Sequence, residues 1–128
     1  TCSIDEKILL SSHGIRVIPM DTVMLQNAVQ ALADDDPAVV SVVSSIEAEA
    51  NTSEIPAERL LQVAKAEVVV KRWATEKQLL GVGAGFAMPP YVQGRLTDQG
   101  IMVGFEVDIM GCLAMLMQYE AALREEGV

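Results

Sequence analysis

The sequence predicts an α/β fold with an open, mostly parallel sheet flanked by helices. Two short apolar stretches rich in β-branched side chains, at 15–20 and 101–105, have the composition of buried strands. The segments around them have the apolar spacing of amphipathic helices. Because two strands do not form a stable sheet by themselves, further strands must come from 39–43, from 81–86 or from chain outside this sequence. We therefore expect 1–128 to be one α/β domain, or a fragment of a domain in a larger multidomain fold.

The first third of the chain alternates helix, strand and helix. Residues 4–12 predict a short helix, which Gly14 ends because glycine enters the left-handed cap conformation without a steric penalty. A short buried strand is predicted over 15–20. Asp21 is a good N-cap for the next helix, which we expect over 22–33.

Two helices are predicted for the middle of the chain. Asp36 can cap a helix over 37–50 that begins with proline, although its valines also favour a strand and only its length decides for the helix. A longer helix of about six turns follows over 57–80. On it, Glu67 and Lys71 have the i, i+4 spacing that is favourable for an ion pair.

The last third begins with a glycine-rich segment and ends with a helix. The Met-Pro-Pro sequence at 88–90 predicts a break in regular structure, and 96–100 predicts a turn. The second strand, over 101–105, ends shortly before Asp108. Asp108 can cap a final helix over 109–125.

Composition and charge exclude several classes of function. Hydrophobic residues make up 51% of the chain and charged residues 21%, which is typical of a globular protein. Eighteen acidic against nine basic residues give a net charge of −9, which argues against nucleic acid and anionic membrane surfaces as partners. Apolar runs are far shorter than the roughly 20 residues of a membrane-spanning helix. Cys2 and Cys112 suggest neither a disulfide framework nor a metal site, so a cytoplasmic location is expected.

Three features suggest chemistry only weakly. The glycine cluster at 81–85 fails the dinucleotide-binding pattern because Phe86 stands where the last glycine is required, so a close-packed strand or turn is the better interpretation. His13 has no partner in the sequence that would make it catalytic, and we expect it at the surface. Cys112 lies among apolar residues of the final helix and is expected to be a buried, unreactive thiol.

Glu106 and Asp108 form the arrangement that most suggests a functional site. They follow a predicted strand at its carboxyl end, where open α/β sheets bind ligands. Residues two apart on a strand face the same side, and two carboxylates there repel unless a cation, a proton or hydrogen-bond donors lie between them. Such hard oxygen ligands suit Mn²⁺ or Mg²⁺. The alternative is that Asp108 only caps the final helix and Glu106 is solvated.

The order of these elements resembles a known family. Residues 94–101 and 104–116, which include Glu106-Val107-Asp108 followed by glycine and a methionine-containing helix, resemble a segment of the L-fucose/L-arabinose isomerase-type sugar isomerases. In that family a strand ends in Glu-x-Asp before such a helix. The Lys-Arg-Trp sequence at 71–73 lies where the family has another long helix.

The resemblance implies an aldose–ketose isomerase that uses Mn²⁺, has three domains and is a homo-oligomer. It assigns Asp108 as a metal ligand and Glu106 as a carboxylate that orients it, with a small sugar as substrate. The family's second metal-binding carboxylate would lie near 86–91, where this chain has neither Asp nor Glu. Its histidine ligand comes from a later domain, so the remainder of a longer chain is expected as well. The implied reaction moves a proton between C1 and C2 of the sugar through an ene-diol.

Three hypotheses follow. The chain is part of such an isomerase, or it is a sugar-binding relative that has lost metal ligands. Otherwise it is an acidic helical interaction module, with a groove formed by Met110, Met115 and Met117. A structure in which 15–20 and 101–105 do not form a parallel pair would support the interaction module and refute the two sugar hypotheses.

Overall fold

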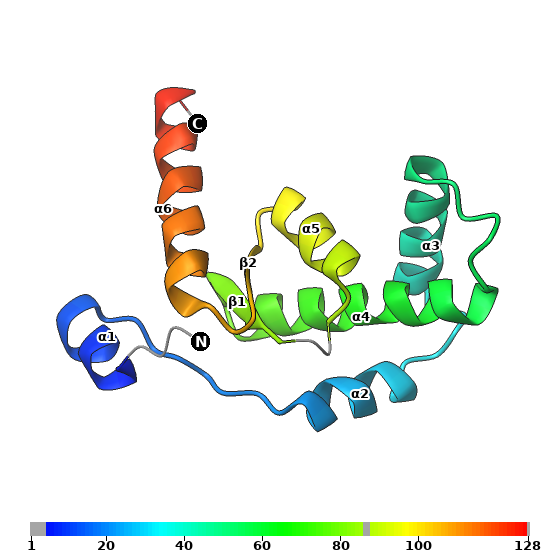
Figure 1. Cartoon of the computed structure of the whole chain (residues 1–128), viewed down its shortest axis with the longest axis horizontal. Coiled ribbons are helices and arrows are strands. Elements are labelled where there is room, and N and C mark those ends of the chain that lie inside the picture. The colour runs from blue at the N-terminus through cyan, green and yellow to red at the C-terminus, as the bar shows by residue number, and fades with distance from the viewer. Residues whose placement is uncertain (1–4, 86–87, 128) are drawn as a thin grey trace.

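The computed structural model describes residues 5–85 and 88–127. Within these residues the chain is mixed α/β and mainly helical (Figure 1). The elements in chain order are α1 (Glu6–His13), α2 (Thr22–Ala31), α3 (Pro37–Glu49), α4 (Ala57–Glu76), β1 (Gly81–Ala84), α5 (Pro90–Asp98), β2 (Met102–Phe105) and α6 (Ile109–Glu125).

Local cap signals determine most helix ends, as the sequence predicts. Asp21, Asp36 and Asp108 cap α2, α3 and α6, and each carboxylate accepts a hydrogen bond from a backbone N–H of the first turn. Pro37 occupies the first position of α3, where its missing N–H has no intrahelical acceptor. Gly14 ends α1 with a φ of +66°.

The sheet consists of one parallel pair. β1 and β2 run side by side, with Gly81 opposite Met102 and Ala84 opposite Phe105, and α5 forms the crossover between them. α4 and α5 pack on one face of the pair, and α6 lies against the other. The expected α/β class is confirmed, but no third strand occurs in the described ranges. Residues 39–43, whose valines also favour a strand, lie in helix α3.

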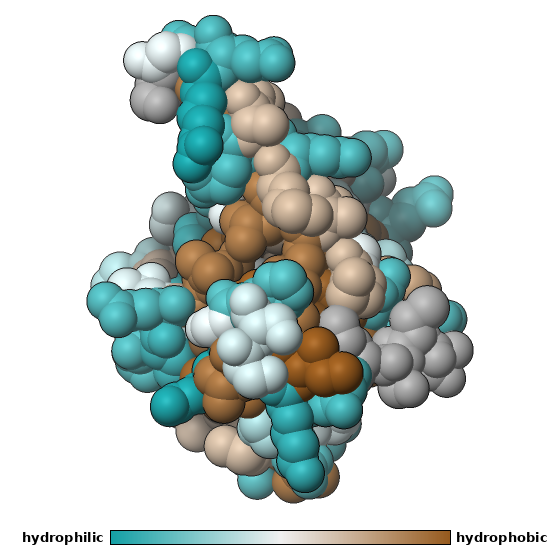
Figure 2. Space-filling view, turned by 90° about the vertical axis from the view of Figure 1, so that its left-hand side faces the viewer, coloured by the Kyte–Doolittle hydropathy of each residue, from teal (hydrophilic) through white to brown (hydrophobic). Residues whose placement is uncertain are grey.

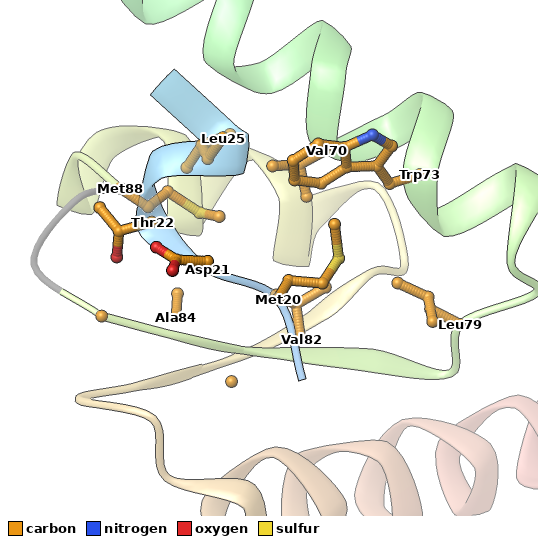
Figure 3. Close-up of a pocket in the computed structure, with 12 residues that line it drawn as sticks. Met20, Asp21, Thr22, Leu25, Val70, Trp73, Leu79, Val82, Ala84 and Met88 are labelled. Carbon is orange, nitrogen blue, oxygen red and sulfur yellow. The ribbon is translucent and has the colours of Figure 1, made fainter. Parts of the chain in front are cut away.

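The prediction of a strand over 15–20 is wrong. This segment has no strand pairing, and β2 pairs with β1 instead. Its composition favours a pleated, half-buried surface, but Ile18 is 44% exposed and Pro19 has no N–H to donate to a neighbour. Met20, at its end, lines a cavity beside β1 (Figure 3). The segment therefore lies near the sheet without joining it.

Helix α5 is a second correction, because no helix was predicted there from the sequence. Pro89 and Pro90 do not only interrupt structure, because Pro90 begins the helix at the position where proline is best tolerated. The turn expected over 96–100 is the last turn of α5 followed by Gly100, which has a φ of +85°. Helix α4 ends at Glu76, before the predicted Leu80.

Helix α4 connects the two parts of the core. Its residues 64–70 are all buried, so this stretch is covered on every side. One core cluster joins α4 to the sheet and α5 and contains Ala66, Val70, Ala84, Met88, Val92, Leu96 and Val103. The other joins α4 to α3 and contains Val39, Val42, Ile46, Leu60, Ala64 and Val68. Among the helices described, none has the length and apolar character needed to cross a membrane.

Candidate functional site

Glu106 and Asp108 lie in a tight turn between β2 and α6. The strand ends at Phe105, and Glu106 and Val107 have φ values of +53° and +62°. The expectation that the two carboxylates share one face of a strand is therefore wrong, because side-chain alternation requires extended backbone. The backbone N–H of Val107 donates to the carbonyl of Ala84 at 2.9 Å. This bond keeps the turn at the carboxyl end of the parallel pair.

Two glycines make room for the turn. A Cβ atom on Gly111 would lie 2.5 Å from Oδ2 of Asp108, and a Cβ atom on Gly104 would overlap the Asp108 carbonyl oxygen. Asp108 Oδ1 accepts a 3.0 Å hydrogen bond from the Gly111 N–H. Consecutive left-handed residues that are not glycine are strained, and such strain is common at functional sites. Gly104 and Gly111, on either side of Glu-x-Asp, are the sequence signal for this packing, and the sequence prediction did not use that signal.

Cys112 lies directly behind this turn. It is buried, and its thiol donates to the Met102 carbonyl at 3.3 Å. Burial raises the pKa of the Cys112 thiol, and the nearby Asp108 charge raises it further. The expectation of a buried thiol is confirmed. Cys2 lies outside the described residues.

The described side chains do not form a metal site by themselves. No group of three or more His, Cys, Asp or Glu side chains suited to a metal ion occurs in residues 5–85 and 88–127. Asp108 Oδ1 is used by the helix cap, and Glu106 is exposed on a left-handed turn. A catalytic metal needs several protein ligands supported by further hydrogen bonds. The fit of these residues to Mn²⁺ is therefore incomplete.

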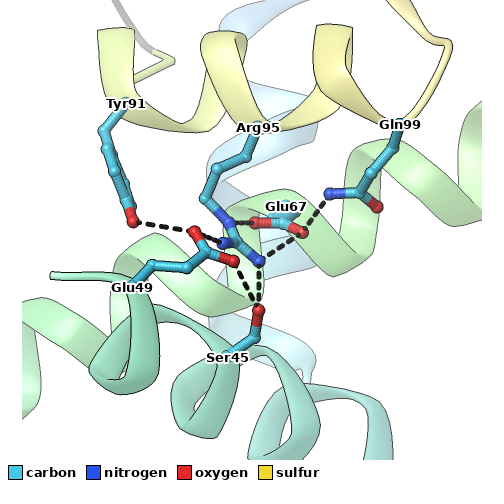
Figure 4. A network of polar contacts seen from close by, with 6 residues as sticks. All are labelled: Ser45, Glu49, Glu67, Tyr91, Arg95 and Gln99. Atoms are coloured by element: carbon cyan, nitrogen blue, oxygen red, sulfur yellow. Dashed lines mark hydrogen bonds and ion pairs between the residues drawn. The ribbon is translucent and has the colours of Figure 1, made fainter.

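A polar cluster that the sequence analysis missed joins α3, α4 and α5 (Figure 4). Arg95 Nε donates to Glu67 Oε2 at 2.6 Å, and Gln99 Nε2 donates to Glu67 Oε1 at 2.9 Å. Arg95 also forms an ion pair with Glu49 and donates to the Ser45 hydroxyl at 3.2 Å. Glu67, expected to pair with a neighbour on its own helix, is 0% exposed and pairs with a residue of α5.

The pKa shifts in this cluster arise from the Arg95 guanidinium, which Glu67 and Glu49 share. Hydrogen bonding to Glu67 raises the pKa of Arg95 above its ordinary value, against the opposing effect of burial. Hydrogen bonds from Arg95 and Ser45 lower the pKa of Glu49. The Arg95 guanidinium therefore lies between two carboxylates, those of Glu67 and Glu49.

An apolar cavity lies on the α4 side of the sheet. It is about 100 Å³ and lies between residues 20–25, α4 and β1, with Trp73 and Met88 among its walls (Figure 3). Asp21 and Thr22 are its charged and hydroxyl side chains, and Asp21 Oδ1 accepts the N–H of Val23 as the cap of α2. This cavity therefore offers a small, mainly apolar volume.

Comparison with known proteins gives no relative for this chain. No family model, curated protein or solved structure matches it.

Proposed function

We propose that this chain is part of a metal-dependent aldose–ketose isomerase that acts on a small sugar. The observation that carries the proposal is the Glu106–Asp108 turn at the carboxyl end of a parallel strand pair. That edge is where α/β sheets bind ligands. The segment that resembles the sugar isomerases ends one strand, forms this turn and continues into α6, and these are contiguous elements of one unit.

The criterion given above for refuting the sugar hypotheses is met, because 15–20 does not pair with 101–105. A parallel pair is nevertheless present, with 81–84 in the place of 15–20. The strand, turn and helix that carry the resemblance depend on 102–125 and its neighbour β1, and they do not require 15–20. For this reason the isomerase proposal stands on the geometry of the turn.

This chain would supply the carboxylate of Asp108 and, two residues before it in the same turn, that of Glu106. Asp108 is held by the first turn of α6, and Glu106 is displayed on the solvent side of the turn. The remaining ligands of an Mn²⁺ ion would come from outside the described residues. This requirement is consistent with a larger multidomain chain, a more extensive sheet and a homo-oligomer, which we include in the proposal.

The test is Asp108→Asn in the natural polypeptide that contains this sequence. Asparagine caps helices about as well as aspartate, so the fold is kept while the charge is lost. We expect aldose–ketose conversion with added Mn²⁺ to fall at least about 10-fold, the lower end of the loss for removing a group that supports a metal ligand. Asp35→Asn, on an exposed loop, is the matched control. Unchanged turnover in Asp108→Asn would refute the proposal.

One observation favours the interaction module as a second candidate. Of the 17 residues of α6 only Cys112 is buried, while Met110 and Met117 are 49% and 68% exposed. Apolar surface is visible at the foot of this helix (Figure 2). Isolated helices of this length are marginal in water, so tertiary contacts normally stabilise them. If the interaction module is correct, the double variant Met110→Lys, Met117→Lys would change the mass of the native assembly that the natural polypeptide forms. Sugar conversion would be undetectable in both the wild type and the variant.

A further inference from the structure

The polar cluster forms one side of a cleft between three helices. The cleft has a volume of about 340 Å³ and lies between α3, α4 and α5. All of its lining residues except Val42 carry polar side chains. Ligand pockets in proteins are mostly apolar, and a cleft lined in this way suits a ligand that is itself polar throughout.

The inner part of the cleft is held rigidly. Glu67 is completely buried, and both of its carboxylate oxygens accept hydrogen bonds, from Arg95 and Gln99 (Figure 4). A buried ion pair gives little net stability compared with apolar residues of similar size. Its effect here is to fix the guanidinium between Glu67 and Glu49. The groups around it are therefore ordered before any ligand arrives.

The charges of the cleft disfavour strongly charged ligands. Its lining has three carboxylates and two cations, and Arg95 is already shared by two of the carboxylates. A phosphate or sulfate group would therefore find Lys71 as the cation of the lining that takes part in no ion pair among the described residues, together with the equally unpaired carboxylate of Asp98. Two of the three carboxylates are directed at Arg95, so a metal cation would have to displace that ion pair. A ligand without net charge fits this lining best.

Unused donors and acceptors remain on the walls. In the part of the chain that the structure describes, neither Lys71 on α4 nor Asp98 on α5 takes part in an ion pair. Lys71 can only donate hydrogen bonds and Asp98 can only accept them, whereas Ser41 can do both. A row of hydroxyl groups, each of which donates and accepts, matches such a mixed lining.

We infer that this cleft binds a neutral polyhydroxylated molecule, either a monosaccharide or an alditol. The site shares no lining residue with the Glu106–Asp108 turn. It is therefore independent of the proposed active site, and it would be a second carbohydrate site if both proposals hold.

The experiment is a saturation-transfer NMR titration of the natural polypeptide with D-glucitol. We expect saturable binding with a Kd of about 1 mM, typical of a small ligand held by a few hydrogen bonds. Lys71→Met and Asp98→Asn are expected to weaken binding about tenfold each, the loss for one hydrogen bond to a charged group. Lys77→Met and Asp35→Asn are matched controls outside the cleft and are expected to keep the wild-type Kd. Thermal unfolding of each variant checks that it is folded.

Three outcomes would overturn the inference. The first is that D-glucitol shows no saturable signal, and the second is that the cleft variants bind it as the controls do. The third is that Asp108→Asn abolishes binding while Lys71→Met does not, which places the sugar at the Glu106–Asp108 turn and supports the proposed function alone. Conversely, unchanged D-glucitol binding by Asp108→Asn together with unchanged sugar conversion would support the cleft and refute the isomerase proposal.

Discussion

Removing the Arg95 guanidinium is expected to destabilise the chain strongly, because it leaves Glu67 as an uncompensated buried charge. Arg95→Met keeps the apolar stem and removes the partner of a carboxylate that is 0% exposed. Breaking a buried pair in this way costs about 3–5 kcal/mol. A chain of 128 residues has a total stability of about 6–19 kcal/mol, so the variant should still fold. With a urea m-value of about 2 kcal/mol/M, the midpoint should fall by about 2 M.

A double substitution distinguishes the effect of leaving Glu67 without its charge partner from the effect of losing the packing of the Arg95 side chain. Replacing both members, as Arg95→Met with Glu67→Leu, removes the buried charge and should restore stability to within about 1 kcal/mol of wild type. Arg72→Met is the matched control, because Arg72 forms a much more exposed ion pair with Asp36 and should cost only about 0–1 kcal/mol. The reasoning is refuted if Arg95→Met costs no more than Arg72→Met, or if the double variant is less stable than Arg95→Met alone.

Three further predictions concern the turn, the exposed ion pair and the thiol. Gly104→Ala should destabilise the chain by about 1–3 kcal/mol, because its methyl group overlaps the Asp108 carbonyl; an unchanged urea midpoint would contradict this contact. The hydrogen bond from Arg72 lowers the pKa of Asp36, so this stabilisation is present above the ordinary pKa of 3.8 and is lost as pH falls through the folded value. The stability difference between wild type and Arg72→Met should accordingly shrink below pH 3.8, and an equal difference at pH 7 and pH 3 would disprove the assignment. Burial raises the pKa of Cys112, so peptide mapping should find it alkylated by iodoacetamide only slowly at pH 8 until urea unfolds the chain; rapid labelling of the folded protein would show an accessible thiolate.

The sequence predicted those parts of the fold that depend on local chemistry. Asp21, Asp36 and Asp108 cap helices because a carboxylate followed by apolar helical spacing satisfies backbone donors within three residues. The left-handed cap at Gly14 is equally local. The helical state of α3 followed from its length, although its valines favour a strand.

The wrong predictions concern interactions between distant parts of the chain. Residues 15–20 have the composition of a strand, but pairing requires a partner edge, and β2 pairs with β1 instead. The Arg95–Glu67 pair joins residues 28 positions apart on different helices, and no local pattern indicates it. Glu106 and Asp108 were found from their position after a strand. Their left-handed backbone could not be foreseen, because neither Glu106 nor Val107 is a residue that favours positive φ.

The most direct test of the proposed function is solvent exchange at the sugar carbon next to the carbonyl. The natural polypeptide would be incubated with Mn²⁺, aldopentoses and aldohexoses in D₂O, and deuterium at C2 would be measured by NMR. Proton transfer through an ene-diol predicts deuterium incorporation for at least one sugar in the wild type, with loss of incorporation in Asp108→Asn. No incorporation for any sugar, or equal incorporation in Asp108→Asn, would contradict the role that we propose for the Glu106–Asp108 turn.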